Sequence, residues 1–294
     1  MNRGIAYIII SGIAFLIVNL IVKVLSVGIP GSEDLQFQKY PIHELVLARS
    51  IVSFALSFYA LKRKGLPILG NNRKWLFMRG ISGTFALTLF FYTIQNLPLA
   101  IASTVQYLAP VFTILFAVFL SGEIIKKHQW IFIFSALAGV ILISSPNFLS
   151  ENLAKINLNW LLIGVLSASF SGLAYSSIVK LKNTENPLNV VLYFPMIAMP
   201  IMFVWCLFDF VMPTGLEWLL LIVMGVFTQI AQLFLTKGLM SEETSIIAPF
   251  QYLGAIYAAL AGYLIFDESL SIIVYIGIAL ILAGVVFNTI SAKK

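Results

Sequence analysis

The feature that most constrains this chain is a series of long apolar segments separated by short polar breaks. A helix needs roughly 20 mostly apolar residues to cross the hydrocarbon core of a bilayer. Ten segments meet that requirement: 4–25, 42–61, 75–95, 100–120, 128–145, 158–179, 188–211, 216–236, 245–266 and 271–290. Only 10% of the residues are charged, whereas soluble domains carry about 25%. The sequence therefore predicts an all-α integral membrane protein with ten transmembrane helices.

Two of these boundaries need an argument. The first segment is interpreted as a membrane helix rather than a cleavable signal, because it is long enough to span and no small-residue cleavage site clearly follows it. Only Phe266-Asp267-Glu268-Ser269 separates the last two segments. Two adjacent acids are costly in hydrocarbon, so we expect a tight turn at the membrane surface there.

Lysine and arginine are distributed unevenly over the breaks between segments. With a cytoplasmic N-terminus, the cytoplasmic segments hold 13 cations and the opposite segments hold 2, Lys39 and Lys155, when cations within helices or at their ends are left out. This bias predicts a multi-pass protein of the cell (inner) membrane with both termini in the cytoplasm. Because the cations lie at helix ends, the net charge of +6 indicates a lipid bilayer rather than nucleic acid as the partner.

The second half of the chain resembles the first. When the sequence is shifted by 145 residues, Gln106–Leu108 falls on Gln251–Leu253 and Glu123 falls on Glu268. Over the last two helices of each half, 12 of 46 positions are identical without a gap. The sequence therefore predicts two five-helix repeats, which comprise residues 1–147 and 157–294.

An odd number of helices per repeat has a geometric consequence. The second repeat must enter the membrane in the opposite direction, so the two repeats are inverted relative to each other. Inverted repeats are common in secondary transporters, whose substrate site lies near the membrane midplane where the repeats meet. We therefore expect the functional site between the two halves.

Several motifs carry a resemblance to a known family. The stretch from Arg79 to Glu123 contains a glycine-led helix, a small-residue hairpin, the triplet Pro-Val-Phe from Pro110 and a closing glutamate, and the second helix carries Arg49 in Leu-Val-Leu-Ala-Arg-Ser. In these features the chain resembles the EamA-type ten-helix members of the drug/metabolite transporter superfamily, over nearly its whole length. The second half has Ala255 where the first has Pro110, together with an offset Pro249, so the kinks in the fourth and ninth helices need not be symmetric.

The resemblance implies a central cavity lined by helices one, three, four, six, eight and nine. It also implies that helices five and ten lie at the periphery and form a homodimer contact in some members. Family members carry amino acids, nucleotide sugars and other metabolites, and the motifs do not distinguish among these substrates.

Four ionisable side chains within or beside the predicted helices are candidates for function, because such residues normally face protein or water. Arg49 lies about 12 Å into the second helix, where it is either an anchor for a substrate carboxylate or phosphate or a packing residue paired with Glu44 or with backbone carbonyls. Lys23 and Lys180 either reach their nearest membrane surface or act in binding and gating. Glu44 is either an acid at the outer surface or a proton-coupling group.

Uncharged polar side chains complete the candidate substrate site, since an amide in hydrocarbon needs partners and tyrosine combines an aromatic body with a hydroxyl. The pair Gln106 and Gln251 is the most informative because it recurs by symmetry. The full set is Asn19, Tyr92, Gln95, Gln106, Tyr107, Tyr175, Gln229, Gln232, Gln251, Tyr252 and Tyr257.

These observations favour a secondary transporter that moves a small amphipathic metabolite, anionic or zwitterionic and amino-acid-like or nucleotide-like, by alternating access. The sequence holds no nucleotide-binding, zinc-protease or esterase motif, and its single cysteine and two histidines form no metal-ligand pattern. We therefore expect no catalytic residue, metal or cofactor. Two alternatives stay open: a membrane-embedded enzyme acting on lipid-linked substrates, and a non-transporting membrane regulator.

Overall fold

The computed structural model describes residues 3–27, 37–96, 104–150, 158–266 and 272–292, and within these ranges it contains helices and no strand. The helices are α1 (Arg3–Val27), α2 (Ile42–Arg63), α3 (Arg73–Asn96), α5 (Ala109–Ser121), α6 (Lys127–Ser150), α7 (Leu158–Leu181), α8 (Pro187–Cys206), α9 (Leu216–Ser241), α10 (Thr244–Ile247), the 3₁₀ helix η2 (Ala248–Tyr252), α11 (Leu253–Phe266) and α12 (Ile272–Ala292).

Seven stretches of the described chain are long and apolar enough to cross a membrane, and the stretches Gln129–Ile143 and Ile272–Phe287 are shorter apolar helices. The helix α3, which begins with Arg73 and Lys74, is not among the seven. The chain is thus an all-helical integral membrane protein, and the count of ten spans stays a prediction. The predicted turn at Asp267 and Glu268 lies outside the described residues.

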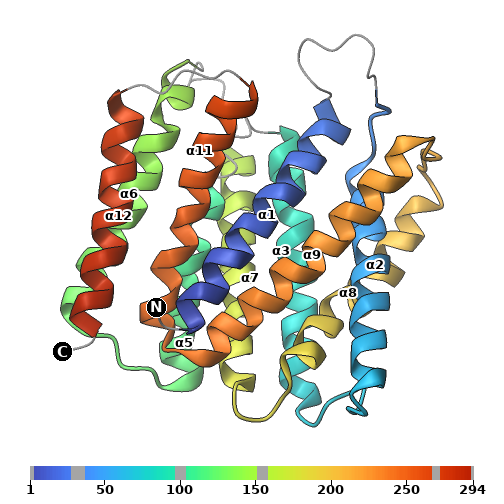
Figure 1. Ribbon diagram of the computed structural model, residues 1–294, viewed down its shortest axis with the longest axis horizontal. Helices are drawn as coiled ribbons and strands as arrows, with labels where there is room; N and C mark the ends of the chain where they lie inside the picture. Colours follow the sequence, from blue (N-terminus) through green and yellow to red (C-terminus); the bar gives the residue numbers. More distant parts are fainter. Residues whose placement is uncertain (1–2, 28–36, 97–103, 151–157, 267–271, 293–294) are drawn as a thin grey trace.

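The long helices pack in pairs: α6 with α12, α3 with α7, α1 with α9, and α2 with α8. Figure 1 shows α6 and α12 together at one edge of the bundle and α2 with α8 at the other. We call the end where α1 begins and α12 ends the lower end, as it is drawn in Figure 1, and the opposite end the upper end.

Glycine allows the two edge helices to approach each other closely. A Cβ atom added at Gly139 of α6 would lie 2.6 Å from the carbonyl oxygen of Gly277 in α12, and one added at Gly277 would lie 2.7 Å from the carbonyl oxygen of Gly139. Both obstacles are backbone atoms, so any larger residue would push the helices apart. Small residues at such crossings are typical of membrane helix pairs.

Two of the predicted spans are interrupted at corresponding places. In the first half a turn at residues 107–108 precedes α5, which has Pro110 in its first turn, and in the second half η2 contains Pro249. Proline lacks the N–H group of a regular helix and fits the first turn. The Gln-Tyr-Leu triplet lies at both interruptions, so the kinks differ in form but not in position.

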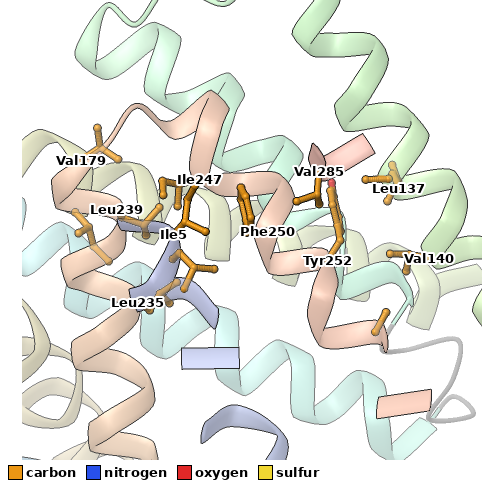
Figure 2. Close-up of a cluster of buried hydrophobic side chains, with 14 of the residues drawn as sticks. Ile5, Leu137, Val140, Val179, Leu235, Leu239, Ile247, Phe250, Tyr252 and Val285 are labelled. Atoms are coloured by element: carbon orange, nitrogen blue, oxygen red, sulfur yellow. The ribbon is translucent and has the colours of Figure 1, made fainter. Parts of the chain in front are cut away.

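An apolar cluster joins the lower halves of several helices (Figure 2). Its members come from α1, α3, α6, α7, α8, α9, α10, η2, α11 and α12, and Figure 2 labels Ile5, Leu137, Val140, Val179, Leu235, Leu239, Ile247, Phe250, Tyr252 and Val285. Tyr252, in η2, is fully buried there. The cluster fixes the interrupted ninth span against the first and last helices.

Candidate functional site

Two arginines lie buried in the interior of the bundle. Arg49 of α2 is 6% exposed and Arg79 of α3 is 2% exposed. Their guanidinium carbons lie 5.7 Å and 5.9 Å from the centre of the Phe194 ring in α8, and that of Arg79 lies 6.0 Å from the ring of Tyr175 in α7. These cation–π contacts bring together side chains from four helices.

The local sequence of α3 explains how the Arg79 guanidinium fits against its own helix. A Cβ atom at Gly83, one turn after Arg79, would collide with the Arg79 guanidinium and lie 3.2 Å from the Phe194 ring. The missing side chain therefore makes the space that the arginine occupies. The side-chain oxygen of Gln232 in α9 accepts a hydrogen bond of 2.9 Å from Arg79 Nη2.

The charge of this arginine pair is not balanced by acids. Within the described part of the chain, neither arginine forms an ion pair, and the Nε atoms of both are buried without a hydrogen-bond partner. The alternative that Arg49 pairs with Glu44 is not realised: no ion pair joins them, Glu44 Oε2 accepts a 2.9 Å bond from the backbone N–H of Val211, and Glu44 Oε1 is buried without a partner in the described structure. Buried charges are costly unless they are paired.

A cavity of about 270 Å³ opens at the upper end between α2, α3 and α8. Its lining includes Tyr92, Trp205 and His43, and Val46 lies on its α2 wall. Val46 is three residues, about one helical turn, from Arg49. Of the helices that the family resemblance implies for a cavity, only α3 lines this one.

The paired glutamines have different surroundings. Gln106 donates a 2.8 Å bond to Ser171 Oγ and accepts a 3.0 Å bond from Ser167, so α7 satisfies its amide. The Nε2 atom of Gln251 is buried without a partner. The neighbouring tyrosines Tyr107 and Tyr252 meet with ring centres 6.3 Å apart.

The amide of Gln229 joins α9 to α2. It accepts a 2.6 Å bond from Ser53 and donates a 2.7 Å bond to Ser57. Because Arg49, Ser53 and Ser57 are spaced by four residues, they lie on one face of α2, the face that meets Gln229.

The remaining predicted residues are scattered. Asn19 and Lys180 are exposed, and Tyr257 packs against Gly12, whose added Cβ would lie 2.9 Å from its ring. The side chains of Lys23 and Gln95 lie outside the described part of the structure. The sequence analysis did not select Arg79 or Phe194; the signal for Arg79 was an arginine followed by Gly80 and Gly83.

Polar contacts tie the loops at both ends. At the upper end Glu217 accepts bonds of 2.6 Å from the Tyr40 hydroxyl and 2.7 Å from the backbone of Gln38. Burial and this hydrogen bond raise the pKa of Tyr40 above its ordinary value. At the lower end Glu185 accepts a 2.6 Å bond from the Asn71 backbone and a bond from that of Asn72.

Comparison with known proteins identifies a transporter family and several transporters that are similar to this chain. The model of the EamA-like transporter family matches the chain twice, over residues 2–145 and 158–290. A pseudopaline exporter from Pseudomonas aeruginosa is 28% identical over 274 residues, which cover 91% of this chain and 89% of the exporter. An S-adenosylmethionine uptake transporter from Rickettsia felis is 24% identical over 83% of this chain and 80% of its own length.

Two further comparisons agree with these. A riboflavin transporter from Rhizobium johnstonii is 25% identical over 97% of this chain and 90% of its own length. A solved crystal structure with 19% sequence identity superposes with a TM-score of 0.77 over 98% of both chains, which shows that the fold is shared.

Proposed function

Because the chain belongs to the EamA-like transporter family, we propose that it is a secondary transporter that moves a small amphipathic metabolite across the cell membrane by alternating access. Its relatives are named as exporters or uptake transporters of different small molecules. The family therefore assigns transport, and the mechanism and substrate class must be argued from the chain itself.

The inverted repeat is part of the proposal, and helix positions support it. The helix α8 begins 145 residues after α2, and α12 begins 145 residues after α6. The helices α2 and α8 run in opposite directions, because the start of each contacts the loop after the other: Glu44 bonds to Val211, and Asn189 donates a 2.6 Å bond to the carbonyl of Pro67. Glu44 and Asn189 are themselves 145 residues apart.

The packing carries the proposal furthest, because the main contacts between helices recur when the two halves are exchanged. Exchange turns the α3–α7 contact into α9–α1, α5–α7 into α11–α1, and α2–α9 into α8–α3, and all six contacts are present. The polar contacts of the loops follow the same rule: the Tyr40–Glu217 pair becomes Glu185–Asn72. Two halves with equivalent contacts can exchange conformations and thereby open each side in turn.

The same relation supports a position for the substrate site. Residues that contact their own repeat mates lie on the axis between the halves, and two such pairs occur: Arg49 with Phe194, and Tyr107 with Tyr252. We place the transport pathway along this axis, between the buried arginines and the two interrupted spans.

Transport by purified protein is the decisive test. The full chain is reconstituted in liposomes and offered a panel of labelled amino acids, nucleotides, sugar phosphates and vitamins, with and without a proton gradient. A carrier shows counterflow: internal unlabelled solute accelerates uptake of the same labelled solute. Absence of any protein-dependent movement would refute the proposal, and chemical conversion of a lipid-linked substrate would favour the enzyme alternative.

Orientation and assembly are tested separately. In a Cys206→Ser background, which removes the single cysteine, Lys39→Cys should react with an impermeant maleimide on intact cells and Lys64→Cys should not. Labelling of Lys64→Cys but not of Lys39→Cys would show that the termini lie outside the cell, opposite to the proposed orientation. The edge pair α6 and α12 is the surface we expect in a homodimer, and mass photometry of the detergent-solubilised protein measures that state.

A further inference from the structure

We propose that Arg49 and Arg79 together bind an oxyanion of the substrate, a carboxylate or a phosphate, while Phe194 and Tyr175 pack against its apolar part. This inference rests on the proposed function only in naming the bound molecule as the transported one. It assigns to the site a substrate class that the family leaves open.

Unused hydrogen-bond donors are the first argument. A guanidinium carries five N–H donors in a fixed planar fork. In the described structure Arg79 donates to Gln232 and Arg49 donates to no group, although both side chains are more than nine-tenths buried. Two such forks match the paired oxygens of a carboxylate or phosphate.

The absence of a competing acid is the second argument. Acids at the upper ends of α2 and α9 have other partners: Glu44 accepts from Val211, and Glu217 accepts from Tyr40, Gln38 and Thr214. Two cations that lie against the same Phe194 ring are therefore held together without a counter-charge from the described chain. A bound anion would relieve both the burial cost and the repulsion.

The aromatic walls and the nearby cavity define the rest of the ligand. Phe194 contacts both guanidinium groups, and Tyr175 contacts that of Arg79. The cavity at the upper end reaches Val46, about one turn from Arg49 on the same helix, and Lys39 and His43 lie at its upper margin. A ligand with an anionic head and a flat apolar body fits the arginines, the aromatic rings and the cavity better than a cation or a sugar does.

Binding is measured first, on the purified full chain in detergent at pH 7.5, by thermal unfolding with benzoate, phenyl phosphate and the neutral isostere benzamide. A ligand that binds the folded state raises the unfolding temperature, and the rise grows with the logarithm of ligand concentration divided by its dissociation constant. Benzoate or phenyl phosphate should stabilise the wild type, the better of the two identifying the oxyanion, and benzamide should not. Arg49→Gln and Arg79→Gln should weaken that binding by about 10- to 100-fold.

The control variants separate binding from structure. Arg63→Gln removes an exposed arginine at the end of α2 and should leave probe binding unchanged. Without probe, Arg49→Gln and Arg79→Gln should unfold at or above the wild-type temperature, because an uncompensated charge has been removed. If either glutamine variant fails to fold, its lysine counterpart keeps the charge but loses the fork, and should bind benzoate at least about tenfold more weakly. Equal stabilisation by benzamide, no stabilisation by any probe, or unchanged binding in the variants would overturn the inference.

Transport then distinguishes the two proposals. A solute that moves in the proteoliposome panel should lose transport when its oxyanion is converted to an amide or methyl ester, and Arg49→Gln should abolish the difference between the two forms. Equal transport of both forms by the wild type would refute the oxyanion site and leave the transporter intact. Probe binding that depends on both arginines, without transport of any solute, would refute the transporter and leave the site intact.

Discussion

Replacing Ser53 and Ser57 together by alanine should destabilise the protein more than replacing Gln229 by methionine. The Gln229 side chain is 7% exposed and uses both ends of its amide, at 2.6 Å to Ser53 and 2.7 Å to Ser57. In membranes such interhelical bonds contribute about 0.6 kcal/mol each on average. The double serine change removes both bonds and leaves a buried amide without partners, which costs about 1–3 kcal/mol more. We therefore expect a loss of about 2–4 kcal/mol.

Methionine at position 229 leaves no unpaired amide. The freed serine hydroxyls can bond to the carbonyl one turn earlier in their own helix, as Thr113 does with Ala109 at 2.7 Å, so the expected loss is about 1 kcal/mol. SDS-induced unfolding followed by tryptophan fluorescence measures the loss of unfolding free energy in the double serine variant and in Gln229→Met. Ser82→Ala is the control, because that buried hydroxyl bonds only within its own helix. The reasoning is refuted if Gln229→Met costs as much as the double serine change.

Three further predictions use other parts of the fold. Gly139→Ala should lower the unfolding free energy by about 1–3 kcal/mol, because it pushes α6 away from Gly277. Gly164→Ala should lower it clearly less, because the nearest atoms to its Cβ, at 3.1 Å, belong to side chains. Similar losses for the two variants in SDS unfolding would argue against backbone contact as the cause. Glu217→Gln replaces one of two acceptor oxygens that face several donors and should lower the unfolding free energy by about 1–3 kcal/mol. Limited proteolysis of the loop before α2 measures the effect, and an unchanged cleavage rate would contradict it. Burial raises the pKa of Glu123 above 4.5, against the opposing hydrogen bonds that Thr244 of α10 donates to its carboxylate. The folded state therefore retains the proton to higher pH, and stability should fall as pH rises from 4.5 through that higher pKa. The unfolding temperature of Glu123→Gln should depend less on pH over that window.

Much of the fold follows from where apolar residues are interrupted by charges. The predicted start of the second helix at residue 42 and of the eighth at 216 match α2 and α9, because charged or proline-containing loops precede them. The ends are less predictable: α9 continues to Ser241 rather than 236, since Gly238 and Leu239 beyond Lys237 are buried against other helices. The 3₁₀ segment η2 was not predicted, because apolar periodicity does not distinguish a tightened helix from a regular one.

The candidate site was only partly accessible from sequence. Arg49 stood out because it is deep in an apolar segment, while Arg79, which follows Arg73 and Lys74 closely, was not among the predicted site residues. Its burial depends on where α8 crosses α3, which composition does not encode. Gln229 was predicted as a substrate ligand, and whether the amide serves the substrate or joins helices depends on partners in α2 that only tertiary structure reveals.

The proposed axis between the repeats explains why the site departs from symmetry where it does. A residue on a two-fold axis faces its own mate, so an arginine repeated there would bring two like charges into contact in a medium of low dielectric. At this position the first half has Arg49 and the second has Phe194, which meet at 5.7 Å as cation and ring. Substitution of one mate converts a repulsive pair into an attractive one and leaves the guanidinium edges free. Replacing Phe194 by leucine should therefore weaken probe binding without removing a donor, and unchanged benzoate affinity in that variant would show that the ring does not position Arg49.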